Sequence, residues 1–224
     1  MKNKVTVVAL FAATVGAVAL QASVDSFTGV FPGDDFVQLF SITVGPDSSL
    51  LAQSFGYAGG TNGNGTVIPA GGFDTFFSLF DPAGDLFLTN DDGGCTKVGT
   101  DPVTGGCFDS YLNVTDLINP GVYTLALTES PNQAQGSLGQ PDTFAFPEGT
   151  GNFTCAAFGP GSPTSPFCDG TQRNGDWALD ISGSDVTSVV AAAATPEPSY
   201  LPLLLVGFAG AVFWRVLRQV GARN

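Results

Sequence analysis

Histidine is absent from all 224 residues, and methionine occurs only once. Histidine is the usual general base near neutral pH, the usual partner of serine and cysteine nucleophiles, and a common zinc ligand. Its absence excludes the Ser-His and Cys-His hydrolases and most zinc enzymes. The sequence therefore favours a protein that is not an enzyme.

Basic residues are nearly missing from the middle of the chain. Between Ser23 and Thr195 only Lys97 and Arg173 are basic, against nineteen acidic residues, which gives this stretch a net charge of −17. Such a surface repels phosphate backbones, so nucleic acid is not an expected partner. The charge suits divalent cations or cationic partners, and it also serves simply to keep the exterior soluble.

The composition and the apolar pattern predict strands. Thirty glycines, fifteen prolines and nineteen phenylalanines favour short strands joined by tight turns. Residues 36–44 alternate, with Phe36, Phe40, Ile42 and Val44 on one face.

A hairpin is expected next, because Asp81-Pro82-Ala83-Gly84 has the composition of a type I turn between strands at 73–80 and 86–90. Further strands are expected at 50–57, 110–114, 122–128, 152–158 and 177–182. Eight strands at this spacing predict an all-β domain, an antiparallel β-sandwich or jelly roll.

Residues 1–22 have the pattern of a secretory signal peptide with a short helix. Lys2 and Lys4 precede an apolar run at 5–20, and Ala17-Val18-Ala19 supplies a small-residue cleavage site. Cleavage is expected after Ala19 or Ala22. The alternative is a retained N-terminal anchor, since sixteen residues approach a short membrane span.

A second hydrophobic run near the other end predicts a membrane anchor. The expected plan is an ectodomain at 23–190, a linker at 191–199, a transmembrane helix at 200–217 and a basic cytoplasmic tail at 218–224. Fifteen apolar residues rise about 22 Å as a helix, short of a hydrocarbon core of about 30 Å, so the span is marginal. Arg215, Arg218 and Arg223 should stay cytoplasmic, which places the ectodomain outside.

The motif Pro196-Glu197-Pro198, followed by the hydrophobic run and the basic cluster, resembles the PEP-CTERM sorting signal of exopolysaccharide-producing Gram-negative bacteria. The resemblance implies that an exosortase, a membrane enzyme, cuts near this motif and releases or transfers the ectodomain. The destination would be the cell surface or the extracellular matrix. A permanent C-terminal anchor is the alternative.

A second resemblance covers about 55 residues. These segments are similar in order to the pre-peptidase C-terminal (PPC) β-sandwich, a noncatalytic module: Phe73-Asp74-Thr75, Leu79-Phe80-Asp81, Asn90-Asp91-Asp92-Gly93-Gly94, Asp109-Ser110-Tyr111-Leu112 and Pro120-Gly121-Val122-Tyr123-Thr124-Leu125. The cysteine-bearing insertion between Gly94 and Asp109 departs from that pattern.

Four cysteines in an exported chain predict two disulfides, in one of three connectivities. The sequence-local pairing of Cys95 with Cys107 and of Cys155 with Cys168 is favoured, because it closes two polar loops rich in glycine and proline.

Oxygen ligands gather at one predicted turn. Asn90, Asp91 and Asp92 are consecutive, and Asp109 should return to the same end of the sheet, which makes a candidate calcium site. The alternative is that these residues are ordinary turn formers. Calcium is the one cofactor that the sequence suggests.

Three functions remain open. The first is a structural envelope or matrix protein. The second is a module that binds extracellular polysaccharide through exposed aromatic residues such as Phe55, Tyr57 and Trp177. The third is a hydrolase with two carboxylates, for which the spacing singles out no pair.

Overall fold

The computed structural model describes residues 23–192, apart from 118, 141 and 159–165. The predicted signal peptide (1–22), most of the linker with its Pro196-Glu197-Pro198 motif, the predicted membrane helix (200–217) and the basic tail (218–224) lie outside the described residues. Within the described part of the chain, no helix is long and apolar enough to cross a bilayer.

The described residues contain eleven strands and one short helix, joined by turns and loops. In chain order they are β1 (Val24–Val30), β2 (Gln38–Val44), β3 (Ser48–Ser54), β4 (Gly60–Thr61), β5 (Val67–Ile68), β6 (Thr75–Phe80), β7 (Leu86–Asn90), β8 (Tyr111–Leu117), β9 (Gly121–Glu129), α1 (Phe153–Phe158), β10 (Asp176–Ser182) and β11 (Val186–Ala191).

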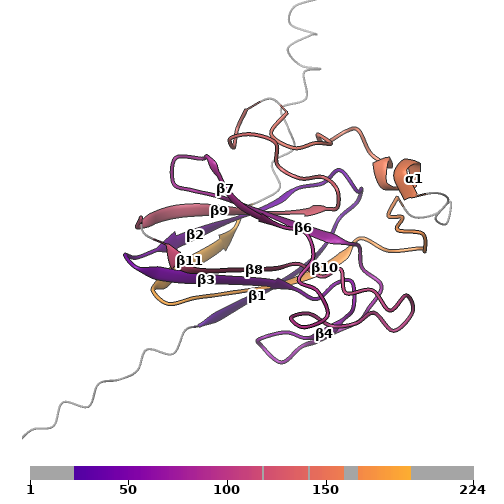
Figure 1. The fold of residues 1–224 in the computed structure, drawn as a ribbon, viewed down its shortest axis with the longest axis horizontal. Coiled ribbons are helices and arrows are strands. Elements are labelled where there is room, and N and C mark those ends of the chain that lie inside the picture. The colour runs from indigo at the N-terminus through magenta and orange to yellow at the C-terminus, as the bar shows by residue number, and fades with distance from the viewer. Residues whose placement is uncertain (1–22, 118, 141, 159–165, 193–224) are drawn as a thin grey trace, which may run out of the picture.

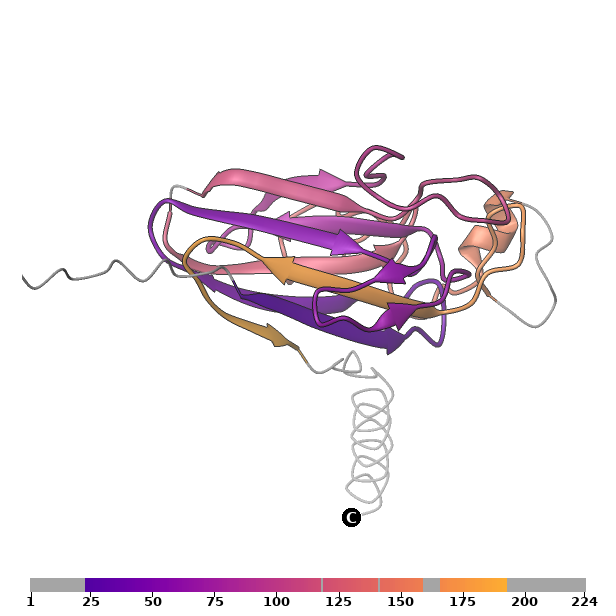
Figure 2. The same cartoon turned by 90° about the horizontal axis from the view of Figure 1, so that it is seen from below.

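Two antiparallel sheets form the body of the domain (Figure 1). One has the strand order β1-β10-β3-β8, the other has the order β11-β2-β9-β6-β7, and β4 and β5 form a small separate ribbon. The helix α1 lies at one end, outside the two sheets (Figures 1 and 2). The all-β class predicted from the sequence is confirmed.

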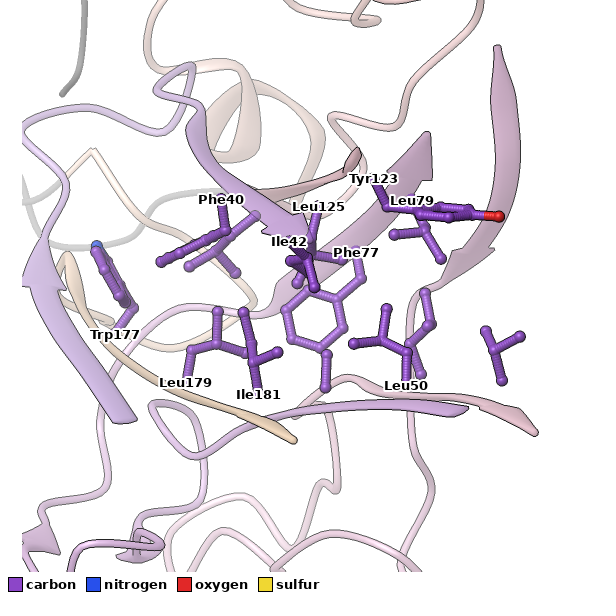
Figure 3. Close-up of a cluster of buried hydrophobic side chains, with 14 of the residues drawn as sticks. Phe40, Ile42, Leu50, Phe77, Leu79, Tyr123, Leu125, Trp177, Leu179 and Ile181 are labelled. Carbon is purple, nitrogen blue, oxygen red and sulfur yellow. The ribbon is translucent and has the colours of Figure 1, made fainter. Parts of the chain in front are cut away.

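Alternating apolar residues build the core between the sheets. In β2 the side chains of Phe40, Ile42 and Val44 are buried, as their spacing predicts. Figure 3 shows Leu179 and Ile181 of one sheet facing this row across the interior. The interior is therefore apolar and continuous.

The strand β6 differs because both of its faces are buried. Its inner face joins the main core through Phe77 and Leu79, while Phe80 packs outward against Ala134 and Phe144 from the segment that follows β9. That segment covers the outer face of the sheet, so β6 carries buried apolar residues on both faces instead of on one.

The predicted β6–β7 hairpin is confirmed. The Asp81 carbonyl accepts the Gly84 N–H at 2.9 Å, and Asp81 Oδ1 accepts the N–H groups of Ala83 and Asp85. Gly84 has a positive φ of 85°, a conformation that glycine adopts at little cost.

The prediction of a strand at 152–158 is wrong, because this segment forms the helix α1 (Phe153–Phe158). The buried carboxylate of Asp34 accepts the N–H groups of Asn152 and Thr154, and also the Thr154 hydroxyl. Such side-chain acceptors satisfy the free N–H groups that begin a helix. The capping residue lies 118 to 120 positions earlier, so a local pattern could not reveal it.

Four strands were not predicted. They are β1 and β11, one edge strand of each sheet, and the two-residue strands β4 and β5. In β1, Gly29 lies directly opposite Trp177 of β10 in the register. A Cβ on Gly29 would run into the Trp177 ring.

Gly29→Ala is therefore expected to lower the free energy of unfolding by about 1–3 kcal/mol, the usual cost of overpacking. Urea denaturation would measure it. Gly136→Ala is the matched control, because a Cβ on Gly136 meets nothing within 4 Å. Equal stability of the two variants would contradict this account of the Gly29–Trp177 contact.

Both disulfides have the sequence-local pairing that the sequence favours. Cys95 is bonded to Cys107 and Cys155 to Cys168, with sequence separations of 12 and 13. None of the four cysteines lies in a strand of the two sheets.

Candidate cation site

Three aspartates meet where the β6–β7 hairpin opens. Asp74 immediately precedes β6, while Asp91 and Asp92 follow β7. The two strands are antiparallel, with Phe77 opposite Asn90, so the start of one and the end of the other share an edge. One carboxylate oxygen from each aspartate lies within 4.8 Å of the other two.

These carboxylates differ in their exposure to water. Asp74 is half-buried, whereas Asp91 and Asp92 are exposed. Burial, followed by the charges of Asp91 and Asp92, raises the pKa of Asp74 to about 9. Burial and then the charge of Asp91 raise the pKa of Asp92 to about 6. At neutral pH Asp74 therefore keeps its proton unless a cation offsets the neighbouring charges.

A fourth carboxyl group lies behind this cluster. Glu129 ends β9 directly opposite Thr75 in the register and is only 1% exposed. Its Oε2 atom and the Oδ1 atom of Asp74 are buried without a hydrogen-bond partner among the described residues. Burial, then the charges of Asp74 and Asp34, raises the pKa of Glu129 well above its usual range. Unpaired buried carboxylates are costly, so a proton or a cation beside Asp74 and Glu129 would stabilise this end of the sandwich.

Not all four residues suggested by the sequence join the cluster. Asn90 uses its amide within the protein, because Oδ1 accepts the Tyr111 N–H at 2.7 Å and Nδ2 donates to the Asp92 carbonyl. Asp109 is 1% exposed, and its oxygens accept hydrogen bonds from Ser54, Tyr57 and Ala58. Asp91 and Asp92 are brought together, whereas Asp109 orders the backbone that follows β3.

A buried network of hydroxyl groups fixes the base of the cluster. The Ser54 hydroxyl lies 2.7 Å from that of Thr75, and both accept the Ser110 N–H. The Ser110 hydroxyl in turn lies 2.6 Å from the carbonyl oxygen of Asp91. These bonds connect β3 and β6 to Ser110, the residue before β8, so the backbone beneath Asp91 is held by both sheets.

Sequence reasoning missed Asp74 and Glu129 as members of this site. The register of the predicted hairpin could have found Asp74, since a strand pairing that sets residue 77 opposite 90 brings 74 close to 91 and 92. Glu129 offered no such signal, because it is the single ionisable residue at the end of the predicted strand and has no oxygen-rich turn beside it.

A second group of charges surrounds Arg173, which is 4% exposed. Its Nη2 lies 3.2 Å from Asp101 Oδ2, and its Nε lies 3.0 Å from Asp169 Oδ2. The guanidinium carbon stacks 3.6 Å from the centre of the Tyr57 ring, whose hydroxyl donates to Asp169. Asp101 lies in the loop closed by Cys95–Cys107, and Asp169 follows Cys168, so Arg173 joins the two disulfide loops.

The aromatic residues named as polysaccharide platforms lie mostly inside. Tyr57 is fully buried beneath Arg173, Trp177 is 7% exposed, and Phe55 is partly buried. Stacking on a sugar needs an open ring face. Tyr57 cannot offer one in this structure.

No protein-family model matches the chain, and no curated protein sequence matches it.

Proposed function

We propose that the chain is an exported, exosortase-sorted protein of the cell surface or extracellular matrix, with a noncatalytic and structural β-sandwich. The observation that carries the proposal is the oxidised state of its cysteines, all four of which form disulfides. Disulfides persist in oxidising compartments and are rare in the cytosol.

The distribution of charge supports export. Five of the seven basic residues lie before the first hydrophobic run or at the end of the last one, where they direct membrane insertion. The order of Pro196-Glu197-Pro198, hydrophobic run and basic cluster supports sorting by an exosortase.

The burial of the Arg173 cluster supports a noncatalytic role. Arginine and aspartates next to a tyrosine could form an active site, but Arg173 is 4% exposed and Asp101 1% exposed. A substrate has no access to these groups in the closed fold. Their role is to hold the disulfide loops in place.

The mature protein from the native host tests the sorting proposal. Intact-mass analysis is expected to find a chain that lacks residues 1–19 or 1–22 and ends near Pro196-Glu197-Pro198. A Pro196→Ala/Glu197→Ala variant should keep Arg215, Arg218 and Arg223 and stay in the membrane. Pro202→Ala, a proline replacement outside the motif, is the control. A wild-type chain that keeps its C-terminal residues would indicate a permanent anchor.

The carboxylate cluster supports a second function, the binding of a hard divalent cation such as Ca²⁺. Asp74, Asp91 and Asp92 are oxygen ligands, and the unpartnered Asp74 Oδ1 is the atom that a cation would satisfy. Calcium takes six to eight oxygen ligands, so water would complete the set. The ion would tie the β6–β7 hairpin to the end of the sandwich.

Calcium is expected to raise the melting temperature of the full chain in detergent. At a hundredfold excess over its dissociation constant, a ligand stabilises the folded state by about 2.7 kcal/mol. Asp74→Asn should abolish the response, while Asp116→Asn, an exposed position on β8, should keep it. An unchanged melting temperature in the wild type would contradict the calcium site.

Without calcium, stability is expected to fall as the pH rises from about 4 towards about 9. The Asp74 carboxyl has a pKa of about 9 when folded and 3.8 as a free side chain, so the folded state binds more protons in this window. The stabilisation that the protonated Asp74 carboxyl provides is complete below pH 3.8. It is lost as this carboxyl gives up its proton in the folded protein, near pH 9. Urea titrations at several pH values would show the slope, which Asp74→Asn should reduce.

A further inference from the structure

The sequence contains three motifs of asparagine, any residue but proline, and serine or threonine, the pattern in which sugars are attached to the asparagine amide. They are Asn64-Gly65-Thr66, Asn113-Val114-Thr115 and Asn152-Phe153-Thr154. To act as an acceptor in the folded protein, such a motif needs a solvent-exposed amide and a backbone that can enter the active site of another enzyme. The structure separates the three motifs by these two requirements.

The motif at Asn152 is closed by the cap of α1. Thr154 is fully buried, and its N–H and hydroxyl groups both donate to the Asp34 carboxylate. The N–H of Asn152 donates to the same carboxylate. Entry into an active site would break all of these bonds, so the folded domain does not offer Asn152 as an acceptor.

The motif at Asn113 is part of the strand β8. The side chains of Asn113 and Thr115 are exposed, but Val114 between them packs into the core. Val114 and Asn113 pair with Leu50 and Leu51 of β3 in the register. The backbone of this motif is therefore held in a sheet, and an enzyme could bend it away only by separating β8 from β3.

The motif at Asn64 lies at the tip of the β4–β5 ribbon, outside the two sheets (Figure 1). Asn64, Gly65 and Thr66 are all exposed. A Cβ added to Gly65 would meet nothing within 4 Å, so the space around the middle residue is open. The Gly63 N–H donates to Asp180 Oδ2 at 2.6 Å and ties the ribbon to β10. The ribbon thus presents the motif on an anchored, accessible turn.

The Asn64 amide is also oriented by the third residue of its motif. The Thr66 hydroxyl donates to Asn64 Oδ1 at 2.8 Å, and the Thr66 N–H donates to the same atom at 3.2 Å. Donors at an amide oxygen polarise the amide and make its N–H groups more acidic. The Asn64 Nδ2 atom itself donates to none of the described residues, so it is open to an incoming sugar.

We propose that Asn64 is a glycosylation site, modified on the folded domain by a transferase of the native host. The donor is a glycosyl phosphate, a sugar whose anomeric carbon carries a phosphate leaving group. Asn64 Nδ2 forms a bond to that carbon and the carbon–oxygen bond to the phosphate breaks. The phosphate leaves with the electron pair, and the amide gives one proton to a base of the transferase. The inference goes beyond the proposed function and uses no part of the cation site.

Mass spectrometry of intact glycopeptides from the full-length protein, purified from its native host, tests the inference. A sugar is expected on Asn64 and on neither Asn113 nor Asn152. Thr66→Val should abolish the modification, because valine has a similar shape without the hydroxyl group. Thr66→Ser, which keeps the hydroxyl group, is the matched control and should retain the sugar. Near-ultraviolet circular dichroism would verify that both variants are folded.

Each outcome decides for or against the inference. An unmodified Asn64 in the wild-type protein would overturn it, whichever cell fraction holds the protein, and so would a sugar that survives Thr66→Val. A sugar on Asn113 or Asn152 would show that the fold does not select the acceptor, and would overturn it too. Spontaneous deamidation of the Asn64-Gly65 pair leaves no sugar on the peptide and does not need the Thr66 hydroxyl, so it cannot be mistaken for the expected result.

Discussion

Arg173→Met is expected to lower the free energy of unfolding by about 3–5 kcal/mol, the usual cost of removing one partner from a buried ion pair. The change leaves Asp101 and Asp169 without their cation. Asp101 Oδ1 already has no hydrogen-bond partner among the described residues, so the remaining charge is poorly compensated. The stacking contact with Tyr57 is also lost.

Lys97→Met is the matched control for this prediction. Lys97 is the only other basic residue between Ser23 and Thr195, and it is exposed with its ammonium 5.5 Å from the centre of the Tyr111 ring. An exposed cation–π contact contributes about 0.5–1 kcal/mol. Urea denaturation of both variants would measure the difference, and equal losses would contradict the role of Arg173.

Removing the Cys95–Cys107 bridge should have the second largest effect. The Cys95→Ser/Cys107→Ser variant is expected to lower the free energy of unfolding by about 3 kcal/mol. Without the bridge, the unfolded chain regains the conformational entropy of a loop of this length. The loop carries Asp101 and Thr104, and Thr104 donates two hydrogen bonds to the Asp101 carboxylate. Opening the loop therefore loosens one side of the Arg173 cluster too.

This shared contact makes the two changes interdependent. Combining the cysteine replacements with Arg173→Met should lower the free energy of unfolding by less than the sum of the two separate losses. The difference, the interaction energy, is expected to be about 0.5–3 kcal/mol. The loss of stability caused by Gly29→Ala should add independently to the other losses, because Gly29 lies on β1, on the other side of β10 from this loop. Full additivity of Arg173→Met with the cysteine variant would show that the bridge and the ion pairs act separately.

Most of the fold could be predicted from patterns formed by residues that are close together in the sequence. The alternation in β2 and the turn at Asp81–Gly84 depend on neighbours in the chain, and the structure contains both. The local disulfide pairing was favoured because it closes two polar loops rich in glycine and proline, and the structure contains it.

The remaining features depend on contacts between distant residues. The helix α1 depends on a cap from Asp34, and Arg173 reaches Asp101 72 positions away. The edge strand β1 contains Gly29, whose lack of a side chain makes room for the Trp177 ring of β10. The candidate cation site was half predicted for the same reason, since Asp91 and Asp92 are adjacent in sequence while Asp74 and Glu129 arrive through strand pairing.

Export of the acidic domain is the central claim, and the accessibility of its cysteines in intact cells of the native host tests it most directly. A membrane-impermeant protease should digest residues 23–190 from outside, and a maleimide should label the four cysteines only after a reductant is added. A domain protected inside the cytosol, with thiols that react at once, would contradict the account.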